Sequence, residues 1–473
     1  MRIYFNGVTK SYVRALRGIE RPSWAPIEHE IIEVTGRSGG ITTAKKKLVR
    51  VIYVPIEVRG VDSFNLQKAK EDLAAWLIKD NPCPLVFPDE PDRVYFAEVT
   101  GELNLEEILE RGKGILTFIC TDPYKYGTTN NYEKPATTGD VNTLVMRNPG
   151  TVESYPEFTF IAKKQMTFLD IIAEDAYMRI GRPVSVEETI VNPAELILED
   201  SMSTLVGWTT ASQIDGGVRA GSFQANSEGF SVSSFGSGSN WHGPSLQKSI
   251  SQTLKNFQVE MVCSIYSNSV RDVGRIELYL VDPSGNHIGK LSMKDVLQGD
   301  IRNDTEVRIG QLVTGTYLLN GTPEDNLWRS FYGLLRLTRI DGVWSAYVAK
   351  IDGKHVGPMQ ATHIDTLINT DLAALQVHIG VNGTASPSVM KIHKLKVFKR
   401  NVITENVVPI IANAGDEITI NHKTNEIRIN GEDMKKRKDF GGRFFPLKPG
   451  DNALVISPGD AVDINSKVRG AYH

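Results

Sequence analysis

The 473-residue sequence contains few cysteines and no long apolar run. Its three cysteines, Cys83, Cys120 and Cys263, are scattered along the chain, which excludes a disulfide framework and gives no closely spaced zinc pattern. We interpret them as small buried side chains. No segment approaches the length of a membrane span, and the early turn at Asn6-Gly7 leaves no room for the apolar core of a signal peptide. We therefore expect a soluble protein that is made in the cytoplasm and has no membrane contact.

An excess of charge of either sign is also missing. The sequence has 53 basic and 56 acidic residues, which gives a net charge of −3 with neutral histidines. Such a chain has no overall field that attracts nucleic acid or an anionic membrane. We expect no specific nucleic-acid binding.

Catalytic and cofactor motifs are absent as well. The nine histidines are dispersed, without His-Glu-x-x-His, and no Gly-x-Ser-x-Gly is present. The glycine-rich Gly36–Gly40 lacks the Lys-Ser/Thr pair of a phosphate loop, and Asp282–Asn286 has the composition of an ordinary β-turn rather than a calcium loop. The sequence predicts no enzyme, no cofactor and no metal. A glycan-cleaving enzyme stays open as an alternative, because sequence cannot give the distance between two carboxylates.

The sequence is rich in turn residues, with 41 glycines and 22 prolines, which favours a mainly β protein. Its length suggests about three domains of roughly 150 residues. One helix is clearly predicted over 65–79, because five apolar residues recur on one face: Leu66, Ala69, Leu73, Trp76 and Leu77. We expect this helix to pack on the sheet of a first domain, residues 1–130. The polar stretch Asn130–Asp140 predicts a linker.

The C-terminal end reads as part of a β-sandwich that cannot stand alone. Residues 417–420 and 426–429 alternate polar and apolar around a polar turn, which predicts a hairpin with one buried face. Further short strands are predicted at 444–447, 452–456 and 461–464, and together they bury too little apolar area to fold by themselves. The segments that could supply partners lie upstream, at 141–146, 157–161 and 176–180. We therefore predict one discontinuous sandwich, residues 141–195 plus 401–473.

Residues 196–400 are then an insertion into that sandwich. Long strands are predicted at 257–266 and 275–281, and the pair 333–340 and 343–350 flanks the turn Asp341-Gly342. This pattern predicts a jelly-roll or concanavalin-like β-sandwich of about 200 residues.

An aromatic loop in the insertion is the strongest chemical signal. The small residues of Ser234–Gly243 surround Trp241, with Asn240 and His242 beside it. An exposed indole can stack on the apolar face of a sugar while neighbouring polar groups bind its hydroxyls. The alternative is that Trp241 caps the sandwich edge. Trp208 and Trp328 are further candidate sugar-binding residues, whereas Trp344, inside a predicted strand, is expected in the core.

The order of these pieces resembles the distal tail protein of phages with long non-contractile tails. The resemblance covers about 1–182 and 407–473 and rests on four features: the glycine-rich loop ahead of a long strand, the single helix over 65–79, the closing Asp122–Gly127, and the turn Leu447–Asn452. The insertion is similar to the carbohydrate-binding, jelly-roll insertions of longer family members. No sugar-binding residue is carried over from them, because no motif matches residue by residue.

The resemblance implies a homo-hexameric ring of N-terminal β-sandwiches on the end of the tail tube, around a channel for DNA, and a galectin-like C-terminal sandwich that projects outward. It also implies a location at the tail tip of the virion, after assembly in the host cytoplasm. Expected partners are the tail tube protein, tail-fibre or receptor-binding proteins, and host cell-wall polysaccharide. A bacterial lectin or adhesin is a further alternative, disfavoured by the missing export signal.

Overall fold

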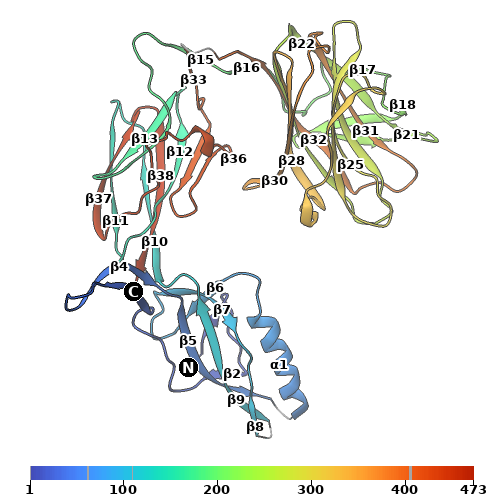
Figure 1. Ribbon diagram of the computed structural model, residues 1–473. Helices are drawn as coiled ribbons and strands as arrows, with labels where there is room; N and C mark the ends of the chain where they lie inside the picture. The colour runs from blue at the N-terminus through green and yellow to red at the C-terminus, as the bar shows by residue number, and fades with distance from the viewer. Residues whose placement is uncertain (1, 61–62, 109, 404–406) are drawn as a thin grey trace.

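The computed structural model describes residues 2–60, 63–108, 110–403 and 407–473 of a mainly β protein, as the sequence predicts (Figure 1). Its buried apolar side chains form three separate clusters, one in the N-terminal part, one in a central sandwich and one in a sandwich formed by the inserted residues. One cluster lies in each of the three domains that we propose from the sequence. Cys120 and Cys263 are buried as expected, and Cys83 is half-buried.

The N-terminal domain is a curved sheet covered by a helix. Its strands pair in the order β2-β5-β9-β7, with β1, β6 and β8 at the margins. Among the described residues α1 (Ser63–Leu77) is the only α-helix, and it buries Leu66, Leu73 and Trp76 against the sheet. The indole N–H of Trp76 donates to the carbonyl of Phe5 at 3.1 Å, which ties the helix to the first strand. The strands are β1 (Tyr4–Phe5), β2 (Val13–Ala15), β5 (Arg50–Arg59), β6 (Cys83–Val86), β7 (Val94–Thr100), β8 (Glu106–Ile108) and β9 (Arg111–Cys120).

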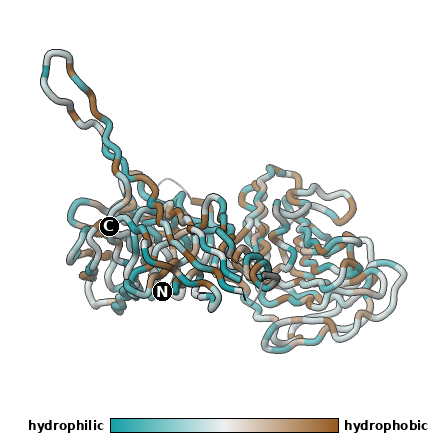
Figure 2. The backbone as a smooth tube through the Cα atoms, turned by 90° about the horizontal axis from the view of Figure 1, so that it is seen from below, coloured by the Kyte–Doolittle hydropathy of each residue, from teal (hydrophilic) through white to brown (hydrophobic). Residues whose placement is uncertain are grey.

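A hairpin of β3 (Ile27–Glu33) and β4 (Gly40–Lys47) forms a two-stranded sheet of its own. Figure 2 shows it projecting from the molecule near the C-terminus. Apolar side chains at its far end are exposed, with Ile31 at 56% and Ile32 at 54%. Isolated hairpins are at best marginally stable in water, so this arm has the character of a segment that packs on something else.

A long antiparallel ribbon joins the N-terminal domain to the central sandwich. Strand β10 (Lys125–Lys134) pairs with β7 at its start and then with β38 (Val462–Tyr472) along its length. The prediction of a linker from Asn130 is therefore wrong as far as Lys134. Its polar side chains lie on the exposed side of a strand whose backbone is bonded to β38, so their composition reflects exposure and not flexibility.

The central sandwich, which we call the outer sandwich, draws its strands from both sides of the insertion. In one sheet β12 (Glu157–Ala162) lies between β38 and β34 (Glu417–Asn421), followed by β35 (Glu426–Ile429) and β36 (Glu432–Asp433). The second sheet has the order β11 (Asn142–Asn148), β37 (Gly450–Ser457), β13 (Phe168–Ile172) and β14 (Tyr177–Gly181). The C-terminal strands thus pair with two of the three upstream segments that the sequence indicates, β11 and β12. The third, β14, pairs with β13, which also pairs with β37 and is not predicted from the sequence.

One predicted strand of this sandwich is wrong. Residues 444–447 have no regular strand, although Phe445 and Leu447 are buried in the core. Pro446 lacks the N–H that a sheet ladder requires, so the side chains pack while the backbone stays irregular.

The inserted sandwich extends from β16 (Ala194–Asp200) to β32 (Val389–Arg400) and packs two large sheets face to face. One sheet has the order β19-β20-β32-β23-β28-β29-β30, with β16 beside β32. The other has the order β17-β22-β31-β24-β25-β26-β27, with β18 and β21 at its margin. The remaining bounds are β17 (Thr209–Thr210), β18 (Gly217–Arg219), β19 (Ser222–Asn226), β20 (Gly229–Ser234), β21 (Trp241–Gly243), β22 (Ser245–Leu254), β23 (Phe257–Tyr266), β24 (Gly274–Val281), β25 (His287–Asp295), β26 (Asn303–Ile309), β27 (Thr316–Gly321), β28 (Ser330–Ile340), β29 (Val343–Asp352), β30 (Lys354–Ile364) and β31 (Leu372–Val381).

The two chain segments that connect the sandwiches run side by side. Strand β15 (Thr189–Val191) pairs in parallel with β33 (Val407–Pro409), and the side-chain amide of Asn401 donates to the carbonyl of Asn192 at 2.8 Å. Because the ends of the insertion meet, the outer sandwich can accommodate it without losing a strand.

A buried histidine should make the outer sandwich sensitive to acid. His422 lies among Phe158, Phe444 and Phe445, and its Nδ1 accepts the backbone N–H of Phe445 at 2.9 Å. Burial lowers the pKa of His422 to about 4. The unfolded chain protonates this residue below about pH 6.5 and the folded chain only below about pH 4, so stability should fall by up to about 3 kcal/mol across that window.

We expect His422→Phe to flatten this pH dependence, measured by amide exchange of β12 and β34 between pH 7 and pH 4. His29→Phe, at an exposed histidine of the hairpin, is the control and should leave the dependence unchanged. An equal loss of protection in both variants would contradict the assignment.

Candidate functional site

Two of the predicted sugar-binding residues lie in the core of the inserted sandwich. Trp328 has no exposed surface and packs edge-on against Phe331, with ring centroids 5.3 Å apart. Trp208 is 8% exposed, and its indole N–H donates to Asp200 Oδ2 at 3.1 Å. Neither ring offers a face to a sugar in this structure. Trp344 lies in the core as expected.

The other three predicted residues meet at the margin of the second sheet. Asn240 is exposed, Trp241 is half-buried, and His242 is buried with its Nδ1–H donating to the carbonyl of Asn240 at 2.7 Å. The guanidinium of Arg275 lies 4.5 Å from the centroid of the Trp241 ring. The segment that the sequence describes as a loop ends in strand β21, which fixes the indole at the edge of the sheet.

Beside Trp241 lies a surface that sequence reasoning missed. Strands β24, β25 and β26 alternate apolar residues that face the core with charged residues on the opposite side. We call this side the charged face; its residues are Arg275, Glu277, Lys290, Lys294, Glu306 and Arg308. The alternation of charges is visible in the sequence at 275–277 and 304–308, but it is also the pattern of an ordinary solvated sheet face.

The charged face is buried and paired rather than solvated. Lys290 Nζ lies 2.6 Å from Glu306 Oε1 and 3.2 Å from Glu277 Oε1. Burial by itself raises the pKa of Glu277. The positive charges of Arg275 and Lys290 outweigh this effect and lower the pKa to about 2. Buried charges persist only when they are paired in this way.

These carboxylates do not suit glycoside hydrolysis. A general acid needs a raised pKa, whereas the pKa values of Glu277 and Glu306 are both lowered by their cationic neighbours. Burial raises the pKa of Asp295 to about 6, but this side chain is completely buried and bonded to Ser267 Oγ at 2.6 Å, so no substrate can reach it.

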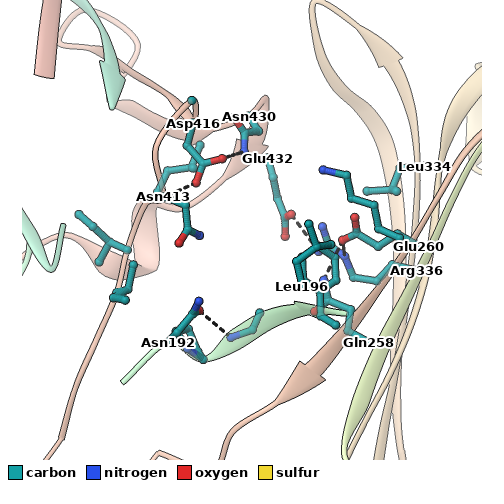
Figure 3. Close-up of a pocket in the computed structure, with 18 of the residues that line it drawn as sticks. Asn192, Leu196, Gln258, Glu260, Leu334, Arg336, Asn413, Asp416, Asn430 and Glu432 are labelled. Carbon is teal, nitrogen blue, oxygen red and sulfur yellow. Dashed lines mark hydrogen bonds and ion pairs between the residues drawn. The ribbon is translucent and has the colours of Figure 1, made fainter. Parts of the chain in front are cut away.

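A cleft lies between the inserted and outer sandwiches (Figure 3). This junction cleft has a volume of about 830 Å³ and is lined by amides and charged side chains, among them Asn192, Gln258, Asn413 and Asn430. Arg336 of β28 spans it, donating to Glu260 Oε1 at 2.7 Å and to Glu432 Oε2 at 2.9 Å. Glu432 belongs to the outer sandwich, so the contact between Arg336 and Glu432, which we call the clasp, links the two domains.

In the described ranges, no group of three or more His, Cys, Asp or Glu side chains is arranged to hold a metal ion. No helix there has the length and apolarity needed to cross a membrane.

Comparison with known proteins finds a phage tail match at each end of the chain. Residues 8–120 match the phage tail protein RIFT-related domain, and residues 394–472 match the C-terminal domain of the siphovirus-type tail component. The distal tail protein of Bacillus phage SPP1 is 26% identical over 166 residues, which cover 33% of this chain and 63% of that protein. Both ends of the chain are therefore similar to siphophage tail components.

Two solved structures are similar to parts of this chain. The crystal structure of SPP1 Dit aligns at 22% identity with a TM-score of 0.34, covering 38% of this chain and 74% of that one. The CBM2 module of the evolved Dit of Lactobacillus casei BL23 phage J-1 aligns at 16% identity with a TM-score of 0.40, covering 45% of this chain and all of that one. The match to the curated SPP1 relative spans just under two thirds of that relative's length.

The clasp at the junction cleft should fix the direction in which the inserted sandwich points. Glu432→Ala leaves Arg336 with Glu260 alone and removes an interaction of about 1 kcal/mol between the domains. We expect a broader distribution of interdomain distances, measured by small-angle scattering, with Asp433→Ala at the neighbouring exposed acid as the control. Identical scattering from all three proteins would show that other contacts hold the junction.

Proposed function

We propose that this protein is a distal tail protein and a structural component of the phage tail tip. In this role it forms a ring that joins the tail tube to the host-adhesion apparatus, and its inserted sandwich binds a host cell-surface saccharide. The observation that carries the structural role is the family match at 8–120 and 394–472, on either side of the insertion. We assign the protein no enzymatic activity.

The projecting hairpin supports self-association. Ile31, Ile32 and Ile41 are about half exposed on an arm that pairs only with itself in the described structure. Exposed apolar side chains gathered on a projecting segment mark a protein contact site. In a closed ring each arm would lie on the neighbouring subunit, and every subunit would use the same pair of surfaces.

The ribbon of β10 and β38 supports the joining role. It continues the sheet of the N-terminal domain into the outer sandwich, and Lys423 Nζ donates to Asp122 Oδ2 at 2.9 Å across that junction. A continuous sheet resists bending better than a flexible linker does. A ring of N-terminal domains would therefore carry its outer sandwiches in a fixed direction.

The ring can be tested on the hairpin. The double change Ile31→Asp and Ile32→Asp places charges where the arm would contact its neighbour, so we expect it to abolish the oligomer at micromolar concentration. The measurement is light scattering during size-exclusion chromatography. Val313→Asp, at a highly exposed valine of the inserted sandwich, is the matched control and should leave the oligomer intact. The ring proposal fails if the unaltered protein is monomeric across salt and protein concentration.

The saccharide role rests on the edge formed by Asn240 and Trp241. A half-buried indole held by a strand is a rigid platform for a sugar ring, and the adjacent amide can bind hydroxyl groups. The buried Trp208 and Trp328 are left out of this proposal, and His242 serves by positioning Asn240.

We expect Trp241→Ala to weaken binding to purified host cell walls about fivefold, because stacking contributes about 1 kcal/mol. Trp24→Ala removes an exposed tryptophan from the N-terminal domain and is the matched control. Equal cell-wall binding by the unaltered protein and both variants would refute the site at Trp241.

A further inference from the structure

The charged face is covered by a segment of its own chain, residues 211–219, which we call the strap. Its ends are tied down: the N–H of Ala211 donates to the carbonyl of Ser245 at 3.3 Å, and the N–H of Ala220, just beyond it, donates to Gly243 at 2.9 Å. Between these points the strap makes hydrogen bonds to side chains of β24, β25, β26 and β31. It is the reason why charged side chains on the outside of a sandwich are buried.

The strap is held on the sheet almost entirely by polar contacts. Gln376 Nε2 donates to the carbonyl of Gln213 at 2.6 Å, and Arg275 Nη2 donates to the carbonyl of Asp215 at 2.6 Å. The backbone N–H of Asp215 donates to the hydroxyl of Tyr279 at 3.2 Å. Ile214 is the one buried apolar side chain of the strap's middle part, and its neighbours Gln213 and Gly216 are exposed.

The carboxylate of Asp215 lies where two cations from different strands converge. Its Oδ2 accepts from Lys290 Nζ at 2.7 Å and also from Arg308 Nη2. The side chains of Lys290 and Arg308 are at least 94% buried, whereas that of Asp215 is 19% exposed. Lys290 and Arg308 therefore lie on the sheet, and the carboxylate of Asp215 contacts them from the solvent side.

Removal of the strap carboxylate would leave the charged face with an excess of positive charge. The sheet contributes four cations, Arg275, Lys290, Lys294 and Arg308, and two carboxylates, Glu277 and Glu306. Asp304, on the same side of β26, is paired with Arg302, and this pair adds no net charge. Asp215 offsets one of the two surplus charges. A buried surplus of this kind favours an anionic partner in the same position.

We propose that the charged face is a binding site for the carboxylate or phosphate group of an anionic saccharide, and that the strap closes this site with Asp215 in the place of that group. This inference rests on the proposed saccharide role and names the class of saccharide. Arg275 links the two sites, because it holds the strap carbonyl and also lies over the ring of Trp241. Opening of the strap would free the guanidinium beside the aromatic platform.

Only molecules in which the strap is open can bind such a ligand. The apparent affinity is therefore reduced in proportion to the fraction of open molecules. Asp215→Asn keeps the backbone contacts but removes the charge that holds Lys290 and Arg308. In the full-length protein we expect this change to tighten binding of poly(glycerol phosphate) or polygalacturonate on the order of tenfold, measured by calorimetry. The two polymers distinguish a phosphate from a carboxylate ligand. Binding of neutral dextran should not change.

Asp300→Asn is the matched control, because it removes the same charge from an exposed position of the same sandwich. A second measurement uses the unaltered protein: saturating polyanion should accelerate amide exchange at residues 212–217, which lose their contacts when the strap opens. The proposal is overturned if Asp215→Asn binds neither polyanion more tightly than Asp300→Asn does, or if strap exchange is unaffected by bound polymer. Cell-wall binding that still depends on Trp241 in that case would leave the saccharide role standing and remove only the anionic site.

Discussion

The pairing of β10 with β38 is the constraint on which the rest of the architecture depends. It joins residues 125–134 to residues 464–472 and so closes the chain across the whole insertion. The same two strands belong to the sheet that contains β7 of the N-terminal domain and β12 of the outer sandwich. Without this ribbon β38 would keep β12 as its partner, but the two domains would be joined only by a flexible connection.

The insertion is tolerated because it leaves the outer sandwich at one place and returns to the same place. The parallel pair of β15 and β33 and the bond between Asn401 and Asn192 hold its two ends together. A domain attached in this way can differ in function without disturbing its host. The contact of Arg336 with Glu432 then adds an orientation that the backbone connection alone does not provide.

Much of this architecture can be read from the sequence, because buried faces impose period-two patterns. The hairpin of β34 and β35, the single helix and the strands that flank Asp341-Gly342 all follow from such patterns. The errors have physical causes as well: Asn130–Lys134 is polar because one side of a paired strand is exposed, and Pro446 interrupts an apolar run. The candidate site was harder to predict. No local signal tells whether Trp208 and Trp328 are buried or exposed, and the charges of β24 to β26 look solvated until the strap is placed over them. Contacts between residues as distant as Asp215 and Arg308 leave no local signal.

The central claim is that this chain builds a tail-tip ring with its saccharide-binding sandwich on the outside. Electron cryo-microscopy of the purified full-length protein tests it most directly. The account predicts six-fold particles in which the N-terminal domains surround a central channel, the hairpin of β3 and β4 lies on the adjacent subunit, and the inserted sandwiches are outermost with Trp241 accessible. Particles that are only monomeric, or rings in which the inserted sandwiches line the channel, would contradict it.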